Sequence, residues 1–119
     1  MMTTREIPPE RWARYFEQVA EHERDHPVRI EVIGESLGAQ AFEEHAPLLD
    51  IELEEKGSEK GAIELSVGGP NGRLGHRIEK PEHVYVEVNA AGEVELLDIE
   101  DREQVKTLVT FEHPMVLEA

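Results

Sequence analysis

From Val28 onward, apolar and charged residues alternate with a period of two. The segments that show this alternation are VRIEVI, LLDIELE, AIELSV, LGHRI, HVYVEV, EVELLDI and QVKTLVTF. Such alternation is typical of antiparallel strands that bury one face and expose the other. The connections KGSEKG, GGPNG, NAAG and DRE are short and rich in turn-forming residues. The sequence therefore predicts an antiparallel β meander over residues 28–113.

The segment GAQAFEEHAP, residues 38–47, alternates least clearly. We interpret it as a strand that pairs back on Val28–Ile33 through the turn ESLG. The expected sheet has about seven strands. A sheet of this size cannot stay flat with its apolar face in water, so we expect a barrel-like or strongly curved sheet. The Leu96–Leu97 doublet shifts the apolar phase, which predicts a β-bulge.

One helix is predicted before the sheet. Residues 1–8 form a short polar lead, and the prolines of PPERW suit a helix entrance because their missing N–H is not needed there. The helix should span residues 9–25 and end before Pro27. Its apolar stripe at helical spacing is Trp12, Phe16, Val19 and Glu23. With this helix packed on the sheet, the fold class is α+β, and residues 1–119 are expected to form a single domain.

Charge is the strongest feature of the composition. The chain has 12 Lys and Arg against 27 Asp and Glu, and its formal net charge is −15. Such a charge repels nucleic acid and anionic membrane surfaces. It permits a basic partner or divalent cations, although the simpler role of a high net charge is to keep a small protein soluble and monomeric. We therefore expect no nucleic acid or membrane partner, and a monomer or homodimer.

The chain has no cysteine, which excludes disulfides, zinc–thiolate sites and thiol nucleophiles. The segment MMTTREIPPE has no apolar signal region, and no apolar run has transmembrane length. We therefore expect a cytoplasmic location.

The stretch HRIEKPEHVYVEV holds the three candidate ligand-binding residues of the sequence: His76, Arg77 and His83. Strand parity directs His76 inward and His83 outward, whereas the ligands of a metal must converge on one point. We therefore interpret HRIEKPEHVYVEVNAAGEVELLDIE, residues 76–100, as an ordinary β-hairpin closed by NAAG. His22 and His26 are four residues apart but lie at the expected C-terminal end of the helix. There they would interact favourably with the negative end of the helix dipole. We expect no metal site and no cofactor.

The sequence shows no catalytic constellation. Ser36, Ser58 and Ser66 lack the GxSxG context of a nucleophile, and GGPNGRLG matches no phosphate-binding loop. Nothing singles out an acid–base pair among so many carboxylates. We therefore expect a protein that is not an enzyme, with an enzyme of unrecognised type as a remaining alternative.

Several segments, in order along nearly the whole chain, resemble a family of small bacterial proteins known only as a domain of unknown function. These segments are TREIP with Trp12 and Phe16, IEVIG, GAQ, PL, HRI with Pro81 and Val84, LDIE, and TLVTF. Ile33 stands where the family pattern has leucine. The resemblance implies a bacterial, self-contained domain of about this length, and it implies no activity, cofactor or catalytic residue.

Two functional hypotheses follow. The first is a non-enzymatic binding or regulatory module that presents an acidic outer face to an unknown protein partner. The alternative is small-molecule or divalent-ion binding at the mouth of the barrel, with His76, Arg77 and His83 as candidate residues.

Overall fold

The computed structural model describes residues 2–34, 38–57, 61–70 and 72–117, with side chains described for all of these except 39–43. The described chain has one α-helix, α1 (Trp12–Glu23), which follows a short 3-10 turn, η1 (Pro9–Arg11). The rest of its regular structure is one antiparallel sheet of eight strands. The predicted α+β class is therefore confirmed.

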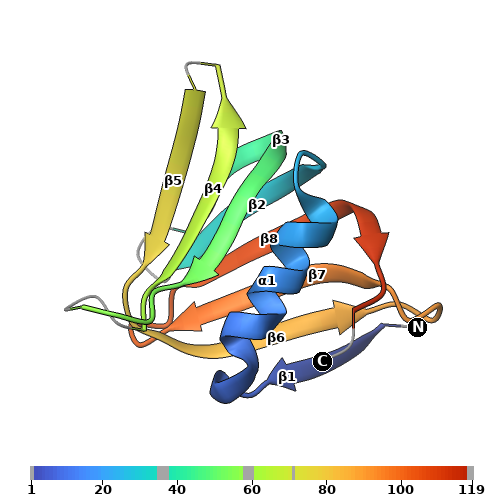
Figure 1. Cartoon of the computed structure of the whole chain (residues 1–119), viewed down its shortest axis with the longest axis horizontal. Helices are drawn as coiled ribbons and strands as arrows, with labels where there is room; N and C mark the ends of the chain where they lie inside the picture. The colour runs from blue at the N-terminus through green and yellow to red at the C-terminus, as the bar shows by residue number, and fades with distance from the viewer. Residues whose placement is uncertain (1, 35–37, 58–60, 71, 118–119) are drawn as a thin grey trace.

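The strands are β1 (Thr3–Ile7), β2 (Pro27–Gly34), β3 (Gly38–Leu53), β4 (Ile63–Gly69), β5 (Gly72–Ile78), β6 (Pro81–Val88), β7 (Val94–Asp101) and β8 (Lys106–Met115). Their order in the sheet is β1-β6-β7-β8-β2-β3-β4-β5. The sheet is strongly curved but not closed, and α1 lies on its concave side (Figure 1). The outermost strands are therefore β1 and β5.

The strand count corrects the expectation of about seven. The lead expected at residues 1–8 contains strand β1, which pairs with β6 so that Ile7 lies opposite Val84. Ile7 is buried, and this single apolar contact was not visible as an alternation in TTREI. The predicted strand at 38–47 does pair back on β2, but it continues without a break to Leu53 as β3.

The meander also consists of two parts. Strands β2 to β5 follow one another in the sheet, and so do β6 to β8. The pairing of β8 with β2 joins the two parts. The predicted bulge is present as a register shift between Val94 and Leu96, after which Leu96 faces outward and Leu97 is buried.

The core lies between α1 and the concave face. Trp12, Phe16 and Val19 are buried, as the apolar stripe predicted. Trp12 also donates a hydrogen bond from Nε1 to the backbone oxygen of Ile7 at 2.8 Å, which ties α1 to β1. The helix ends at Glu23, two residues before the predicted end, because the Asp25 backbone turns to φ 70 and donates to Leu48.

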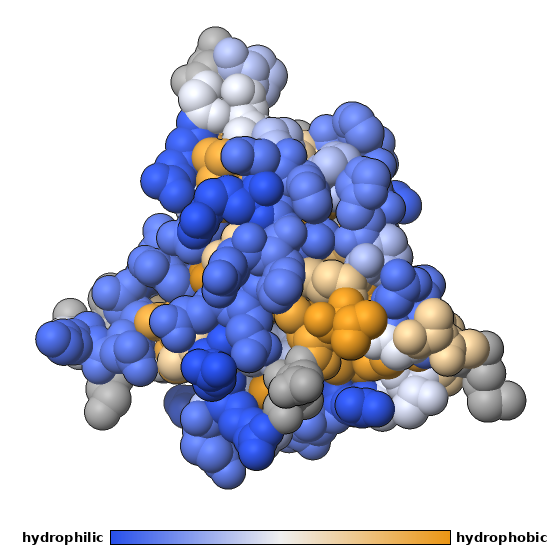
Figure 2. All heavy atoms as spheres, turned by 45° about the vertical axis from the view of Figure 1, so that its right-hand side comes forward, coloured by the Kyte–Doolittle hydropathy of each residue, from blue (hydrophilic) through white to orange (hydrophobic). Residues whose placement is uncertain are grey.

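The outer surface is mostly hydrophilic, and Figure 2 shows one large apolar area and smaller ones on the face that it presents. Within the described ranges, no helix is both long enough and apolar enough to span a membrane.

Candidate binding site on the outer face of β3, β4 and β5

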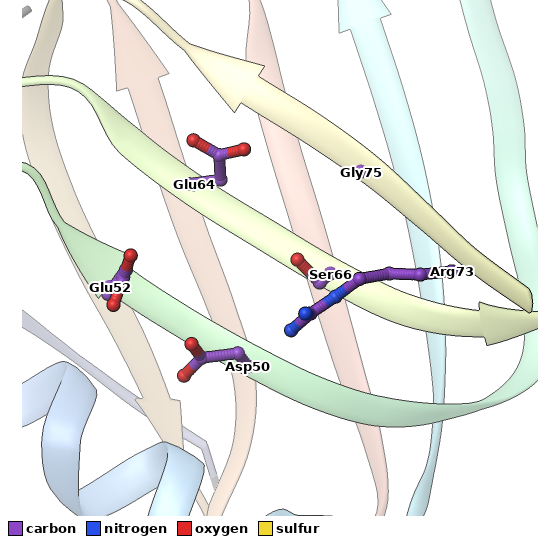
Figure 3. Close-up of a pocket in the computed structure, with 6 residues that line it drawn as sticks. All are labelled: Asp50, Glu52, Glu64, Ser66, Arg73 and Gly75. Atoms are coloured by element: carbon purple, nitrogen blue, oxygen red, sulfur yellow. The ribbon is translucent and has the colours of Figure 1, made fainter.

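A hollow of about 380 Å³ lies on the convex side of the sheet, which we call the outer hollow. Its lining residues are Asp50, Glu52, Glu64, Ser66, Arg73 and Gly75 (Figure 3). Strand β3 supplies the first two, β4 the next two and β5 the last two. The hollow is therefore built by three neighbouring strands rather than by a loop.

Small residues create the hollow. The register places Asp50 opposite Ser66, and Ser66 opposite Gly75. Across the three strands, a serine with a short side chain therefore lies next to a glycine, which has no side chain. At the next outward position of β4, a Cβ on Gly68 would lie 2.9 Å from Cγ of Pro47, so the proline ring covers that glycine. The hollow is thus covered toward Pro47 and open at Gly75.

Ser66 forms the floor. Ser66 is only 8% exposed as a residue, and its hydroxyl points into the outer hollow (Figure 3). Within the described part of the chain, no residue forms a hydrogen bond with this hydroxyl. The buried atoms without a hydrogen-bond partner in the described chain do not include this hydroxyl, so it is open to solvent at the hollow. Ser66 is therefore free to bind a group that enters the hollow.

The charged residues around Ser66 differ in whether they have partners within the described fold. Glu64 forms an ion pair with Arg77 of β5. Asp50 accepts a hydrogen bond from the Ile51 backbone at 2.9 Å. The Arg73 side chain extends over Ser66 toward Asp50 (Figure 3). No described residue forms an ion pair with Arg73, Asp50 or Glu52. The hollow can therefore offer carboxylates to a cation and one guanidinium to an anion.

The three candidate residues from the sequence do not come together. His76 lies on the concave side, where Nε2 is 3.1 Å from Oγ1 of Thr107, and burial lowers its pKa. Arg77 lies beside the outer hollow through its ion pair with Glu64. His83 is on β6, in the other half of the sheet. Since the described sheet is not closed, these residues surround no barrel mouth.

His83 has local partners. Its Nδ1 is 2.9 Å from Oε2 of Glu6, and its ring stacks on Tyr85 at 5.7 Å between ring centres. The hydrogen bond with Glu6 raises the pKa of His83. The inward direction of His76 and the outward direction of His83 follow the predicted parity, and the hairpin between β6 and β7 forms as expected.

A second polar cluster lies at the end of α1. Glu23 is 2% exposed, and its Oε2 is 3.5 Å from Nδ1 of His26. Its Oε1 is buried without a hydrogen-bond partner. Burial raises the pKa of Glu23. The nearby histidines His26, His113 and His22 partly oppose this rise. The rings of His26 and His113 lie 5.3 Å apart.

A third cluster lies on the outer face of β7. Burial, and then the hydrogen bond and charge of Glu100, raise the pKa of Asp98 to about 7. Lys106 opposes this rise. Across all described residues, no three His, Asp or Glu side chains are placed to hold a metal ion. Of these three places, the outer hollow is the one that forms a cavity of about 380 Å³, and hollows of about 340 to 450 Å³ also lie elsewhere on the described surface.

Comparisons with known proteins give the following matches. A model described as a family of unknown function, DUF5335, matches residues 3–119. An uncharacterized protein of Aquifex aeolicus (strain VF5) is 26% identical over 108 residues, which cover 91% of each chain. No solved structure matches the chain.

Proposed function

The chain belongs to the DUF5335 family of unknown function, and we propose that it is a non-enzymatic binding module whose outer hollow holds a cationic group of a partner. The observation that carries this proposal is the Ser66 hydroxyl. Ser66 is only 8% exposed as a residue, its hydroxyl is directed into the hollow, and that hydroxyl has no hydrogen-bond partner among the described residues. A ligand donor that reaches Ser66 would replace water as the partner of this hydroxyl.

The charges favour a cation as that ligand. Three of the lining residues are carboxylates and one is a guanidinium, and because Glu64 is paired with Arg77, Asp50 and Glu52 are the two carboxylates without an ion pair among the described residues. The chain as a whole carries −15, which attracts cations toward its surface and speeds their encounter. Asp50 and Glu52 lie on β3, opposite the open side at Gly75. An ammonium or guanidinium that enters over Gly75 would therefore meet Ser66 and the Arg73 guanidinium first, and the two carboxylates beyond them.

The test uses Nα-acetyl-lysine amide, whose only charge is its ammonium group. In a two-dimensional NMR titration, we expect the backbone amides of Ser66 and Gly75 to shift, with a dissociation constant of about 1 mM, equivalent to about −4 kcal/mol. The double variant Asp50→Asn/Glu52→Gln should bind at least about tenfold more weakly, a loss of about 1.4 kcal/mol.

The matched control is Glu10→Gln/Glu103→Gln, which removes the same charge from two exposed positions outside the hollow. This control should bind as the wild-type chain does. Equal weakening in both double variants would show that only the overall charge matters, and the proposal would then be wrong. The absence of shifts at Ser66 and Gly75 would also overturn it.

A further inference from the structure

The outer hollow opens onto an edge of the sheet. Strand β5 is the last strand, and β4 is its only hydrogen-bonded neighbour in the described sheet. Residues 72–75, its first half, are all exposed, and Figure 1 shows this half standing clear of every strand except β4. An exposed edge presents backbone N–H and C=O groups that can pair with another chain.

Each face of this edge carries exposed groups that a partner could contact. On the concave side, Leu74 is 38% exposed, and it is one of three exposed large hydrophobic side chains among the described residues. On the outer side lie Arg73, which has no ion pair with a described residue, and Gly75, which opens the hollow. An added strand would cover Leu74 on one face and place side chains beside the hollow on the other, because side chains alternate along a strand.

We propose that the edge of β5 is a docking site for an extended segment of a protein partner, which adds to the sheet as an antiparallel strand and places a basic side chain in the outer hollow. This inference rests on the proposed function and specifies its partner. Strand addition of this kind takes affinity from backbone hydrogen bonds and specificity from alternate side chains.

The exposed groups specify those side chains. The partner residue opposite Gly75 is a lysine or arginine, because neighbouring strands are about 4.8 Å apart and a long side chain can cross the glycine toward Ser66. The residue opposite Leu74 is apolar and covers it. The residue opposite Arg73 is acidic and pairs with the free guanidinium. Read in the antiparallel direction, the partner motif is basic, then apolar, then acidic.

A second copy of this chain does not fit that motif. Strand β5, GRLGHRI, contains no acidic residue to pair with Arg73. Two copies paired about Gly75 would place Arg73 opposite Arg77, and like charges directly opposite each other are destabilising. The other edge strand, TTREI, has no apolar residue between a basic and an acidic one. Each copy also carries −15, which opposes self-association.

The probe is the blocked hexapeptide Glu-Thr-Lys-Val-Glu-Thr, whose lysine, valine and second glutamate would lie opposite Gly75, Leu74 and Arg73. We expect amide shifts and slowed hydrogen exchange along residues 72–76. The control peptide Lys-Thr-Glu-Val-Lys-Thr exchanges the charges and is net positive, so attraction to an acidic protein alone would make it bind better. We expect it to bind at least about tenfold more weakly, a difference of about 1.4 kcal/mol.

Two further controls separate strand pairing from charge. The same hexapeptide with N-methylated valine and lysine cannot pair fully, and we expect at least about tenfold weaker binding, again about 1.4 kcal/mol. Gly75→Val should have a similar effect, because its side chain closes the entrance. A Cβ at this position meets no atom closer than the Leu65 backbone oxygen at 3.9 Å, so the fold tolerates it. Thr4→Val on the opposite edge is the matched control and should leave binding unchanged.

The outcomes distinguish this inference from the proposed function. If Nα-acetyl-lysine amide binds at Ser66 and the hexapeptide does not bind along β5, the strand-docking inference is overturned and the proposed function stands. If the hexapeptide binds along β5 but Asp50→Asn/Glu52→Gln has no effect on it, the basic side chain does not enter the hollow and the inference is also wrong. Preferred binding of the control peptide, or shifts confined to β1, would contradict it as well.

Discussion

The concave and convex faces of the sheet treat their polar groups differently. On the concave side, some polar atoms have partners within the fold: Trp12 donates to Ile7, and His76 contacts Thr107. Others on this side, the buried Tyr15 hydroxyl and Glu23 Oε1, have no hydrogen-bond partner among the described residues. On the convex side at the outer hollow, Ser66 and Arg73 have no hydrogen bond or ion pair with a described residue. The paired groups of the concave side stabilise the fold. Ser66 and Arg73 contribute little to it and are available to a partner.

The difference is not simply one of exposure. The hairpin between β6 and β7 is also on the surface, yet its side chains bind one another. Asn89 Nδ2 donates to Glu93 at 3.1 Å and to Glu95 at 2.7 Å, and Oδ1 accepts from the backbone of Ala91 and Glu93. One asparagine thus satisfies the turn and two carboxylates. No described residue of the outer hollow plays the role that Asn89 plays in this hairpin. This distinguishes the hollow from an ordinary solvent-exposed surface.

The largest effect should come from the concave side, at Trp12. Trp12→Ala removes a buried ring and its hydrogen bond to β1. Loss of a core aromatic costs about 3–5 kcal/mol, and a domain has about 5–15 kcal/mol in total. Urea denaturation should show this loss in the free energy of unfolding. Trp12→Phe keeps most of the ring and should cost much less. A midpoint for Trp12→Ala close to that of the wild type would show that α1 is not part of the core.

A smaller effect is expected at Glu23, whose Oε1 is one of the buried atoms on the concave side without a hydrogen-bond partner among the described residues. Burial raises its pKa above the ordinary value of 4.5, so the folded chain binds this proton more tightly than the unfolded chain does. The free energy of unfolding should therefore fall as the pH rises from about 4.5 through the raised pKa. Glu23→Gln should flatten this slope and should be more stable than the wild type at pH 7, because it removes a charge that burial disfavours.

The matched control for this prediction is Glu21→Gln, an exposed position on the same helix. It should leave the pH dependence unchanged. Urea denaturation at a series of pH values measures both variants. If Glu23→Gln is less stable than the wild type at pH 7, the contact of Glu23 with His26 outweighs the burial of its charge, and the buried carboxylate would then be a stabilising part of the fold.

The outer face away from the hollow can be tested at Asp98. Its pKa, raised to about 7, should appear as the midpoint of its side-chain carbon signal in an NMR pH titration. Glu100→Gln should lower this midpoint because it removes the adjacent carboxylate, and Lys106→Gln should raise it because it removes the opposing charge. Because the folded chain binds the proton more tightly, stability should fall as the pH rises from about 4 to about 7. Shifts of the same sign in both variants would contradict this origin.

Much of the fold could be predicted from the sequence because the alternation of VRIEVI and similar segments reports burial directly. The stripe of Trp12, Phe16 and Val19 predicted the face of α1 in the same way. Strand β1 was missed because TTREI buries only Ile7, and one residue makes no pattern. The joining of residues 38–47 and LLDIELE into β3 was missed because GAQAFEEHAP alternates least clearly, whereas pairing with β2 and β4 extends one strand across both segments.

The outer hollow could be predicted only in part. Alternation along each strand identifies Asp50, Ser66 and Gly75 as outward residues, as it also identified Glu52. It does not say which strands are neighbours or in what register, and the hollow depends on both. The bulge after Leu48 in β3 is needed to bring Asp50 opposite Ser66. The cluster at Glu23 did leave a signal, since a carboxylate occupies a position of the apolar stripe, but His113 joins it only through the pairing of β8 with β2.

The smallest effect on stability should come from Arg73, a residue that contributes to docking. Arg73→Gln removes a guanidinium that is exposed and has no ion pair with a described residue. Its free energy of unfolding should stay within about 0.5 kcal/mol of the wild type, as for other surface substitutions.

The same variant should bind the hexapeptide Glu-Thr-Lys-Val-Glu-Thr several fold more weakly, because the second glutamate of the peptide loses its partner. Arg11→Gln, an exposed arginine far from β5 in the chain, should change neither quantity. Urea denaturation and the NMR titration together separate the two roles, and a large loss of stability in Arg73→Gln would show that the outer hollow belongs to the fold in the same way as the concave face does.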